Sequence, residues 1–199
     1  MAIDKEEIEK LMGVPGNVKG VVFQTHEIYI RYREGKEGVK KLEERLRESG
    51  HPLKFKEIRP LEWYPEALSV LVILVAKEVF RWKDSDIFDM GSSAPKYSLI
   101  IRMLMRTFLS IKKVFEESPK YWKKHYDFGV FESFEINEKG KYVILRLKEY
   151  KLHPIVCIYF CGYFHRIAQY VIKSKKITNE ETKCAHRGGP YHEFLIKWK

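Results

Sequence analysis

Residues 128–149, FGVFESFEINEKGKYVILRLKE, contain the pattern that decides the fold class. Apolar and polar side chains alternate on both sides of the turn Asn137-Glu138-Lys139-Gly140, as in two antiparallel strands joined in a β-hairpin. Two further short extended segments, 181–185 and 193–198, flank Arg187-Gly188-Gly189-Pro190. Glycine and proline between such segments predict a second hairpin. The C-terminal third therefore predicts an antiparallel sheet.

Helical patterns lie around these predicted strands. Pro154 opens a predicted helix over 154–173, between the two hairpins, and Pro65 opens a predicted helix over 65–82. The second of these is apolar nearly all round, which predicts burial on most sides. The other expected elements are a helix within 1–17, a strand over 18–33, a helix over 38–49, an extended piece over 52–60, and helices over 96–117 and 119–126.

This order of elements predicts an α+β fold in a single domain, with an antiparallel sheet packed against a layer of helices. Strands and helices do not alternate strictly along the chain, and the sequence shows no internal repeat or low-complexity linker. We expect residues 1–17 to form an N-terminal helical extension and residues 18–199 to form the domain itself.

The composition excludes several classes of protein. The 199 residues are 45% hydrophobic and 14% aromatic, which excludes intrinsic disorder, collagen-like repeats and a disulfide-stapled mini-protein. The net charge of +10 favours an anionic partner, either nucleic acid, an acidic protein or a membrane surface. Charged residues make up 32% of the chain, and lysine and glutamate at that level are also typical of a heat-tolerant organism.

The sequence also bears on the compartment. Residues 1–10 lack the basic start and apolar core of a signal peptide. The longest apolar run, residues 67–76, is about half the length of about 20 residues that a bilayer span needs. Three cysteines are an odd number in a long chain and argue against a disulfide framework. We therefore expect a cytoplasmic protein without a membrane span.

Candidate metal ligands gather in the C-terminal third. Cys157, Cys161 and His165 recur every four residues, which places them on one face of the predicted helix. Cys184 and His192 lie on either side of the second predicted turn. Thiolates and imidazoles are the ligands that zinc prefers, so packing of the helix on this hairpin would bring Cys157, Cys184 and His192 into one site. The alternative is that the cysteines are buried and fill small gaps in helix–sheet packing.

Two segments carry a resemblance to a known family. They are Cys157-x-x-x-Cys161-Gly162-Tyr163 and Glu181-x-x-Cys184-x-x-x-Gly188-Gly189-x-x-His192-x-Phe194. Together they resemble the C-terminal signature of the 4-vinyl-reductase domain. Residues 18–199 as a whole are similar to a group of uncharacterised bacterial proteins best known from myxobacteria, through an opening strand with Gly20, the tract after Pro60 and the hairpin before the last helix.

The resemblance implies a fold and a site. The superfamily of this domain also includes haem nitric-oxide-binding domains, TRAPP vesicle-tethering subunits and the sensor domains of aromatic-responsive transcription activators. It implies an antiparallel sheet with a helical layer that holds a small, usually apolar, molecule. It also implies that the family's cysteines bind a metal, and Cys157 and Cys184 match their positions. The family's last cysteine is His192 here, a departure that keeps a good zinc ligand.

Haem is the second cofactor that the resemblance raises. The haem nitric-oxide-binding domains hold the porphyrin carboxylates with a Tyr-x-Ser-x-Arg motif and the iron with a histidine. In this sequence the motif is absent, because Tyr97 and Ser98 are adjacent and Arg102 follows too late. His125 is a candidate iron ligand, but a histidine at a helix end is more often a capping or surface group. We therefore expect haem to be disfavoured and zinc to be the metal that the chain would bind.

The leading functional hypothesis is a non-enzymatic domain that binds or senses a small apolar molecule. The predicted helices 65–82 and 96–117 would supply the walls of its site, because binding sites need apolar linings with few polar groups. We expect the domain to act through a protein partner or as a homodimer, with any zinc in a structural role. The candidate ligand-binding residues are Arg102, Arg106, Tyr97 and Trp63, of which the two arginines would anchor a carboxylate.

Two alternatives remain open. The first is a reductase or other metal-assisted enzyme that uses Cys157, Cys184 and His192 around an open metal position. The sequence lacks nucleotide-binding, zincin and serine-hydrolase motifs, which favours the non-enzymatic hypothesis. The second is a basic adaptor for nucleic acid or an acidic protein, although no helix-turn-helix or RNA-binding signature is present. Its basic clusters would be Lys112, Lys113, Lys120, Lys123 and Lys124, and Lys173, Lys175, Lys176, Lys183 and Arg187.

Overall fold

Both predicted hairpin regions contribute to one antiparallel sheet in the computed structural model, which describes residues 3–98 and 110–199. The four strands are β3 (Val130–Asn137), β4 (Tyr142–Lys148), β5 (Ile177–Lys183) and β6 (His192–Trp198), in the spatial order β3-β4-β6-β5. On β4, Val143, Leu145 and Leu147 are buried while the residues between them are half-buried. One face of the sheet is therefore directed into the core, as the alternation predicts.

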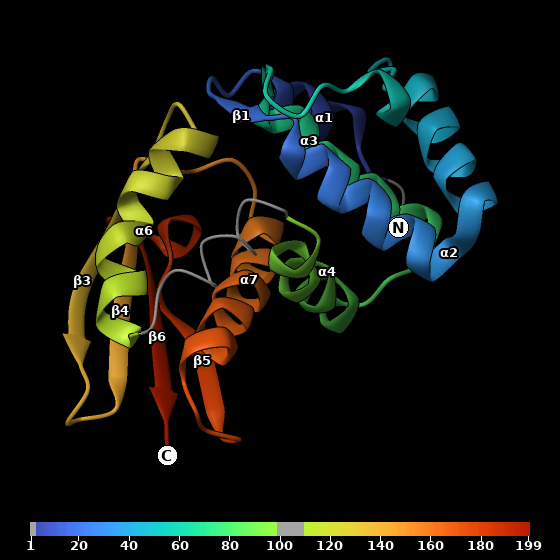
Figure 1. Ribbon diagram of the computed structural model, residues 1–199. Coiled ribbons are helices and arrows are strands. Elements are labelled where there is room, and N and C mark those ends of the chain that lie inside the picture. Colours follow the sequence, from blue (N-terminus) through green and yellow to red (C-terminus); the bar gives the residue numbers. More distant parts are fainter. Residues whose placement is uncertain (1–2, 99–109) are drawn as a thin grey trace.

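Helices cover that inner face. Figure 1 shows α6 and α7 lying along the sheet, with α4 next to α7 and the N-terminal helices gathered beyond them. The helices are α1 (Lys5–Met12), α2 (Val21–Glu48), α3 (Glu66–Val79), α4 (Asp84–Tyr97), α6 (Ile111–His125) and α7 (Ile155–Val171). The smaller elements are the two-stranded ladder of β1 (Asn17–Lys19) and β2 (Trp63–Pro65), and the 3-10 turns η1 (Phe55–Glu57) and η2 (Ala185–Arg187).

Two glycines let α4 and α7 approach each other closely. A Cβ atom on Gly162 would lie 1.9 Å from the carbonyl oxygen of Phe88, and one on Gly91 would lie 1.9 Å from the carbonyl oxygen of Tyr159. Such distances are far below van der Waals contact, so only glycine fits at these crossing points. This pair of helices joins the N-terminal helical layer to the sheet.

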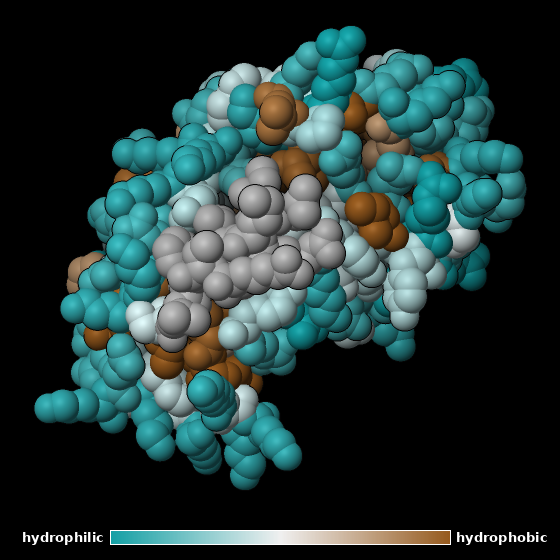
Figure 2. Space-filling view, viewed as in Figure 1, coloured by the Kyte–Doolittle hydropathy of each residue, from teal (hydrophilic) through white to brown (hydrophobic). Residues whose placement is uncertain are grey.

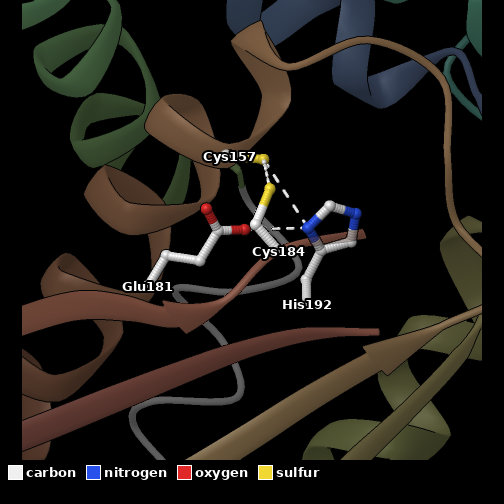
Figure 3. A group of neighbouring side chains, drawn as sticks. All are labelled: Cys157, Glu181, Cys184 and His192. Atoms are coloured by element: carbon white, nitrogen blue, oxygen red, sulfur yellow. Dashed lines mark hydrogen bonds and ion pairs between the residues drawn. The ribbon is translucent and has the colours of Figure 1, made fainter. Parts of the chain in front are cut away.

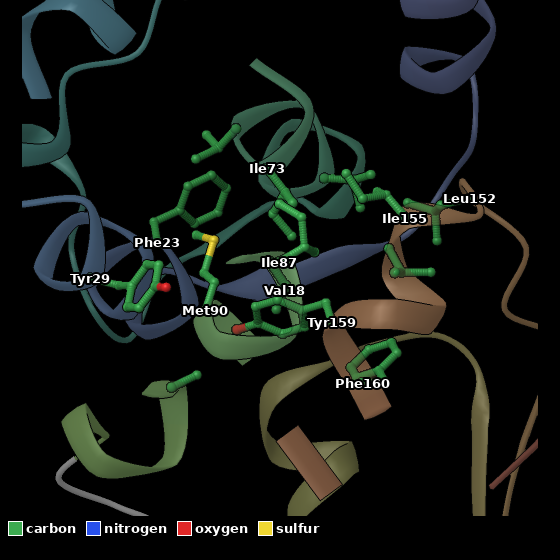
Figure 4. Packing of buried hydrophobic residues seen from close by; sticks show 14 of the residues in the cluster. Val18, Phe23, Tyr29, Ile73, Ile87, Met90, Leu152, Ile155, Tyr159 and Phe160 are labelled. Carbon is green, nitrogen blue, oxygen red and sulfur yellow. The ribbon is translucent and has the colours of Figure 1, made fainter. Parts of the chain in front are cut away.

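The core is continuous from the helical layer into the layer above the sheet. Figure 4 shows Phe23 and Ile73 of the helical layer near Met90 of α4, with Tyr159 and Phe160 of α7 beside them. These side chains are at most 5% exposed. One shared core of this kind is what the predicted single α+β domain requires.

The fold class is confirmed, and so are the two hairpin regions and the helices predicted over 65–82 and 154–173. The strand predicted over 18–33 is wrong, because only Asn17–Lys19 is extended and α2 begins at Val21. Phe23, His26 and Ile30 recur at spacings of three and four and are all buried. This helical period outweighs the strand preference of the β-branched and aromatic residues.

Two prolines lie inside helices that the sequence predicted them to begin. Pro95 lies in the last turn of α4 and does not begin a helix over 96–117, and Pro119 lies inside α6 and does not begin a separate one. A proline within a helix frees the carbonyl of the residue four positions earlier. For Pro119 that carbonyl belongs to Phe115, and it accepts hydrogen bonds from Ser118 Oγ at 2.7 Å and from Ser133 Oγ. The two hydroxyls compensate for the lost backbone bond.

Candidate metal centre and apolar cavity

Four side chains with metal-binding atoms meet between α7 and the sheet. They are Cys157 from α7, Glu181 from β5, Cys184 from the loop after β5, and His192 from the first residue of β6. Figure 3 shows them directed toward one another, and their donor atoms all lie within 4.8 Å of one another. The three ligands expected from the sequence are thus brought together, and Glu181 is added to them.

The turn around Cys184 depends on glycine. Gly188 adopts a left-handed conformation with φ of 84°, which favours glycine. Gly189 donates its backbone N–H to the Cys184 carbonyl at 2.9 Å, and a Cβ atom on Gly189 would lie 2.8 Å from that oxygen. The chain therefore folds back tightly enough to return His192 to the cysteine on the opposite side of the turn.

The distances in this cluster match those between ligands of one tetrahedral ion. Metal–ligand bonds of about 2.3 Å to sulfur and 2.0–2.1 Å to nitrogen place tetrahedral ligands about 3.8 Å apart for S···S and about 3.6 Å apart for S···N. The Cys157 and Cys184 Sγ atoms are 3.7 Å apart, and Cys157 Sγ lies 3.6 Å from His192 Nδ1. Glu181 Oε1 lies 2.8 Å from the same nitrogen, which is a hydrogen-bond distance. The Glu181 carboxylate therefore has to move outward to share an ion.

The backbone fixes the orientation of the imidazole. His192 Nε2 lies 2.8 Å from the carbonyl oxygen of Tyr150, which can only accept a hydrogen bond, so Nε2 carries a proton. Nδ1 is then the ring nitrogen that faces Cys157 and Glu181: it donates to the Glu181 carboxylate when it carries a proton, and it offers its lone pair to a cation once that proton has left. A carbonyl that holds the far nitrogen of a ligating histidine is the usual outer partner in metal sites.

The electrostatics of the cluster favour the arrival of a cation. Burial, reinforced by the Glu181 carboxylate, raises the pKa of the Cys157 thiol far above its usual value, so the thiol keeps its proton when no cation is present. Burial also raises the pKa of Glu181, but hydrogen bonds from His192, Cys157 and Cys184 outweigh it and hold that pKa below its ordinary value. A bound cation would stabilise the thiolate of Cys157 and so lower the pKa of this thiol, which would then release its proton.

Other residues of the sequence pattern lie outside the cluster. Cys161 is half-buried and is not part of the four-residue group, and His165 Nε2 lies 2.9 Å from Gln169 Nε2. Glu181 is a candidate ligand that the sequence pattern did not single out, although it lies in the Glu-x-x-Cys segment. Its spacing from Cys184 is no signal by itself, because only the pairing of β5 with β6 places its carboxylate beside His192.

An apolar cavity of about 80 Å³ lies between α6, α7 and the inner face of β3 and β4. Its lining residues are Val114, Phe115, Ser118, Tyr121, Trp122, His125, Tyr126, Phe131, Leu145, Phe160, Tyr163, Phe164 and Ile167. His125 is its basic group, with Nδ1 2.9 Å from the carbonyl oxygen of Tyr121, and burial lowers the pKa of this histidine. The lining is thus apolar and aromatic with a few polar groups.

A smaller cavity of about 40 Å³ borders the first one and shares His125, Tyr126 and Tyr163 with it. Thr25, Ser98 and Tyr159 add further hydroxyl groups to its lining. Burial raises the pKa of each of the three tyrosines above its ordinary value, so their hydroxyls remain neutral. The smaller cavity therefore adds neutral hydroxyl groups to a lining that is still mostly apolar.

The candidate ligand-binding residues of the sequence analysis are not gathered at these cavities. Arg102 and Arg106 lie outside the described residues. Tyr97 is the last residue of α4 and is half-buried against the core, without lining either cavity. Trp63 is 43% exposed on β2, with Lys19 Nζ 3.8 Å from the centre of its ring. Within the described ranges no helix is long and apolar enough to cross a membrane.

Comparison with known proteins identifies relatives of the fold. No protein-family model and no curated protein matches the sequence. Among solved structures, the chain is similar to an H-NOX protein from S. oneidensis in the Fe(II)NO ligation state, with 15% identity, a TM-score of 0.70, and coverage of 91% of this chain and 99% of the other. It is also similar to an oxygen-binding H-NOX domain related to soluble guanylate cyclases, with 14% identity, a TM-score of 0.65, and coverage of 91% and 95%.

These likenesses confirm the fold and correct one expectation. At 14–15% identity they establish the fold alone, and the narrower membership of the 4-vinyl-reductase family, with its myxobacterial relatives, stays a prediction. The expectation that haem is disfavoured is overturned by the same structures, because the neighbours on this fold are described by iron ligation states and by NO and oxygen binding. The missing Tyr-x-Ser-x-Arg motif is therefore not a sufficient ground for setting haem aside.

Proposed function

We propose that this chain is a non-enzymatic sensor-type domain that holds a small apolar molecule in the cavity between α6, α7 and the sheet. The observation that carries the proposal is the lining of that cavity, in which aromatic and aliphatic side chains from two helices and two strands surround His125 and Ser118. Sites for small molecules are mostly apolar with a few polar groups that set orientation. The signal of occupancy would pass to a partner protein.

The volume limits the size of the guest. An engineered apolar cavity of about 150 Å³ stays dry and accepts benzene, and typical small-molecule sites measure about 300–1,000 Å³. At about 80 Å³, the apolar cavity suits a guest no larger than a single ring. The guest would displace no ordered water from an apolar lining, so burial of its own surface would supply the binding free energy.

Haem has to be tested against the same residues, because the fold neighbours bind NO or oxygen at iron. His125 fits chemically, since its Nδ1–H donates to Tyr121 and leaves Nε2 as the nitrogen that could ligate. The two cavities lined by the described residues measure about 80 and 40 Å³, a size that suits a small guest, and haem binding is decided by direct titration. The arrangement of the described residues supports the smaller guest.

The four-residue cluster supports a second part of the proposal, a structural metal site formed by Cys157, Glu181, Cys184 and His192. Two thiolates, one imidazole and one carboxylate suit a tetrahedral divalent ion of the zinc type. Such an ion would tie the start of α7 to the hairpin of β5 and β6. Four protein ligands close the coordination shell, whereas a catalytic site keeps one position open. This favours a structural over a catalytic role.

Cavity binding is tested with benzene as the probe. We expect benzene to raise the melting temperature of the wild-type chain and to give a saturable signal in calorimetry. Ile167→Phe adds bulk inside the cavity and should abolish both effects. Ile28→Phe makes the same change at a 40% exposed position of α2 and should retain them. Equal benzene binding by Ile167→Phe would refute the proposed site.

Haem is the second arm of that experiment. Titration with haemin is followed by absorbance for the wild type and for His125→Ala. If a Soret band saturates at one equivalent in the wild type and is lost in His125→Ala, haem replaces the small apolar guest as the occupant. The absence of a saturable band in both proteins, together with benzene binding, supports the proposal.

The metal site is tested by elemental analysis and native mass spectrometry of protein purified without added metal. We expect one divalent ion per chain in the wild type, and its loss in Cys184→Ala. Cys161→Ala is the matched control, because Cys161 lies one turn beyond Cys157 on α7 and outside the cluster. Retention of the ion by Cys184→Ala, or its loss from Cys161→Ala, would refute the assignment of ligands.

A further inference from the structure

Three segments that are far apart in the sequence meet at one end of the main sheet. They are the β3–β4 turn (137–142), the connection from α7 to β5 (172–177) and the end of β6 (196–199). The Trp198 N–H donates to the Lys141 carbonyl at 3.1 Å, and the Lys199 N–H donates to the Lys176 carbonyl at 3.2 Å. Figure 1 shows this end of the sheet at the foot of the molecule, where the C-terminus lies.

These segments carry seven lysines, which we call the lysine end. All seven are exposed, and none takes part in an ion pair within the described residues; they are Lys139, Lys141, Lys173, Lys175, Lys176, Lys197 and Lys199. Glu138 is the single acidic side chain of the three segments. Much of the net charge of +10 is therefore concentrated at this end.

Several lysines elsewhere in the chain are paired with acidic side chains. On α6, Lys113 and Lys120 both pair with Glu117, at 3.3 and 2.9 Å, and Lys112 pairs with Glu116 at 3.7 Å. Opposite charges interspersed in this way keep a surface soluble without a strong field. At the lysine end the like charges repel one another, and an approaching anionic surface reduces this repulsion.

We propose that the lysine end docks the protein on an anionic membrane surface. Clusters of four to eight basic residues are attracted to acidic lipid headgroups, with about 1 kcal/mol for each lysine near the surface. The cluster contains lysine alone, and lysine acts as a mobile point charge, whereas arginine is the residue favoured for nucleic-acid recognition. Diffuse attraction to a lipid surface therefore fits its composition better than readout of nucleic acid.

Amphipathic side chains beside the lysines point to the same partner. Tyr170, in the last turn of α7, is 40% exposed, and Trp198 is half-buried opposite Ile177 at the end of the sheet. Tyrosine and tryptophan are favoured at the membrane–water interface, where one side of the ring is apolar and the other is wet. Figure 2 shows apolar residues gathered on the lower part of the visible face, just above long hydrophilic side chains that project from the foot.

The experiment is vesicle co-sedimentation of the full chain. We expect binding to vesicles of phosphatidylcholine and phosphatidylglycerol in equal parts, no binding to pure phosphatidylcholine, and release at high salt because charge attraction is screened. The test variant is Lys173→Gln/Lys175→Gln/Lys176→Gln. Each near-surface lysine contributes about a fivefold factor in affinity, so the triple variant should bind roughly 100-fold more weakly.

A matched control changes the same charge elsewhere. Lys36→Gln/Lys41→Gln/Lys56→Gln alters three exposed lysines of the N-terminal helical layer and should bind vesicles within about twofold of the wild type. Circular dichroism confirms that both variants fold. Equal weakening by the two triple variants, or equal binding to neutral and anionic vesicles, would overturn the proposal. Tighter binding of duplex DNA than of anionic vesicles, lost in the test variant, would also overturn it and assign the lysine end to nucleic acid.

Discussion

Glu66 makes the stability of this protein depend on pH in a way that can be worked out from the structure. Its carboxyl group lies at the start of α3 and is 3% exposed. Tyr150 donates its hydroxyl to Oε1 at 2.7 Å, while Oε2 has no partner in the described residues. Burial raises the pKa of Glu66 from 4.5 to about 8, even though the hydrogen bond from Tyr150 lowers it.

The sign and the size follow from this raised pKa. Between about pH 4.5 and pH 8 the folded state keeps a proton that the unfolded state has released, so the free energy of unfolding falls as pH rises through that interval. At 1.36 kcal/mol for each pKa unit, the full loss above pH 8 is about 5 kcal/mol. This stability is complete below pH 4.5 and is lost as the pH passes the folded-state pKa.

The perturbation is Glu66→Gln, which keeps the oxygen that Tyr150 needs and removes the ionisation. Urea unfolding of both proteins at a series of pH values gives the difference in their free energies of unfolding, in which other titrating groups cancel. We expect this difference to change by about 4 kcal/mol from pH 5 to pH 9, to the disadvantage of the wild type. Glu78→Gln is the control, because hydrogen bonds from Arg45 and the backbone hold the pKa of Glu78 below its usual value against the effect of burial. A pH-independent difference for Glu66→Gln, or the same slope for Glu78→Gln, would refute the reasoning.

Three further substitutions test the packing. Gly162→Ala places a Cβ atom 1.9 Å from the Phe88 carbonyl oxygen and should lower the free energy of unfolding, measured in urea, by about 3 kcal/mol. Gly13→Ala is the control and should be near neutral, because the nearest atom to its Cβ lies at 3.5 Å. Equal effects of the two substitutions would contradict the close approach of α4 and α7. His26→Leu removes two buried ring nitrogens that have no hydrogen-bond partner among the described residues, and it should stabilise the fold by about 1–3 kcal/mol. Burial lowers the pKa of His26 to about 3, so the wild type should also lose stability as the pH falls from 6.5 to 3, whereas the variant should not. The same dependence of stability on acid pH in both proteins would argue against a neutral buried ring. Leu145→Ala, at a fully buried position, should cost about 2.7–5 kcal/mol and enlarge the apolar cavity, so weaker benzene binding by calorimetry would contradict the assignment.

Much of the C-terminal half could be predicted from the sequence because its signals are local. Alternation on β4, the glycine-containing turns, and Pro154 before α7 each depend on residues next to one another in the chain. The secondary structure of the N-terminal half was harder to predict, since the start of α2 is rich in the aromatic and β-branched residues that are typical of strands. Its helical state depends on which face is buried, and that is decided by α3 and α4 packing against it.

The candidate site divides in the same way. Cys157, Cys184 and His192 could be chosen from the sequence because few residue types have ligand chemistry, and the pattern around them was recognisable. Glu181 could not be chosen from the sequence, because glutamate is common on protein surfaces and only the pairing of β5 with β6 places this residue beside His192. The apolar cavity is likewise invisible in the sequence, since its walls come from α6, α7 and two strands.

By itself, the sequence determined the α+β class, the hairpins, the ligand types and the excess of positive charge, because these properties follow from short-range pattern and composition. The tertiary structure alone decided that four donors converge on one point, that an apolar cavity lies beside His125, and that seven lysines gather at one end of the sheet. Each of these depends on distances between residues that are far apart in the chain, and such distances are set by packing of the whole core.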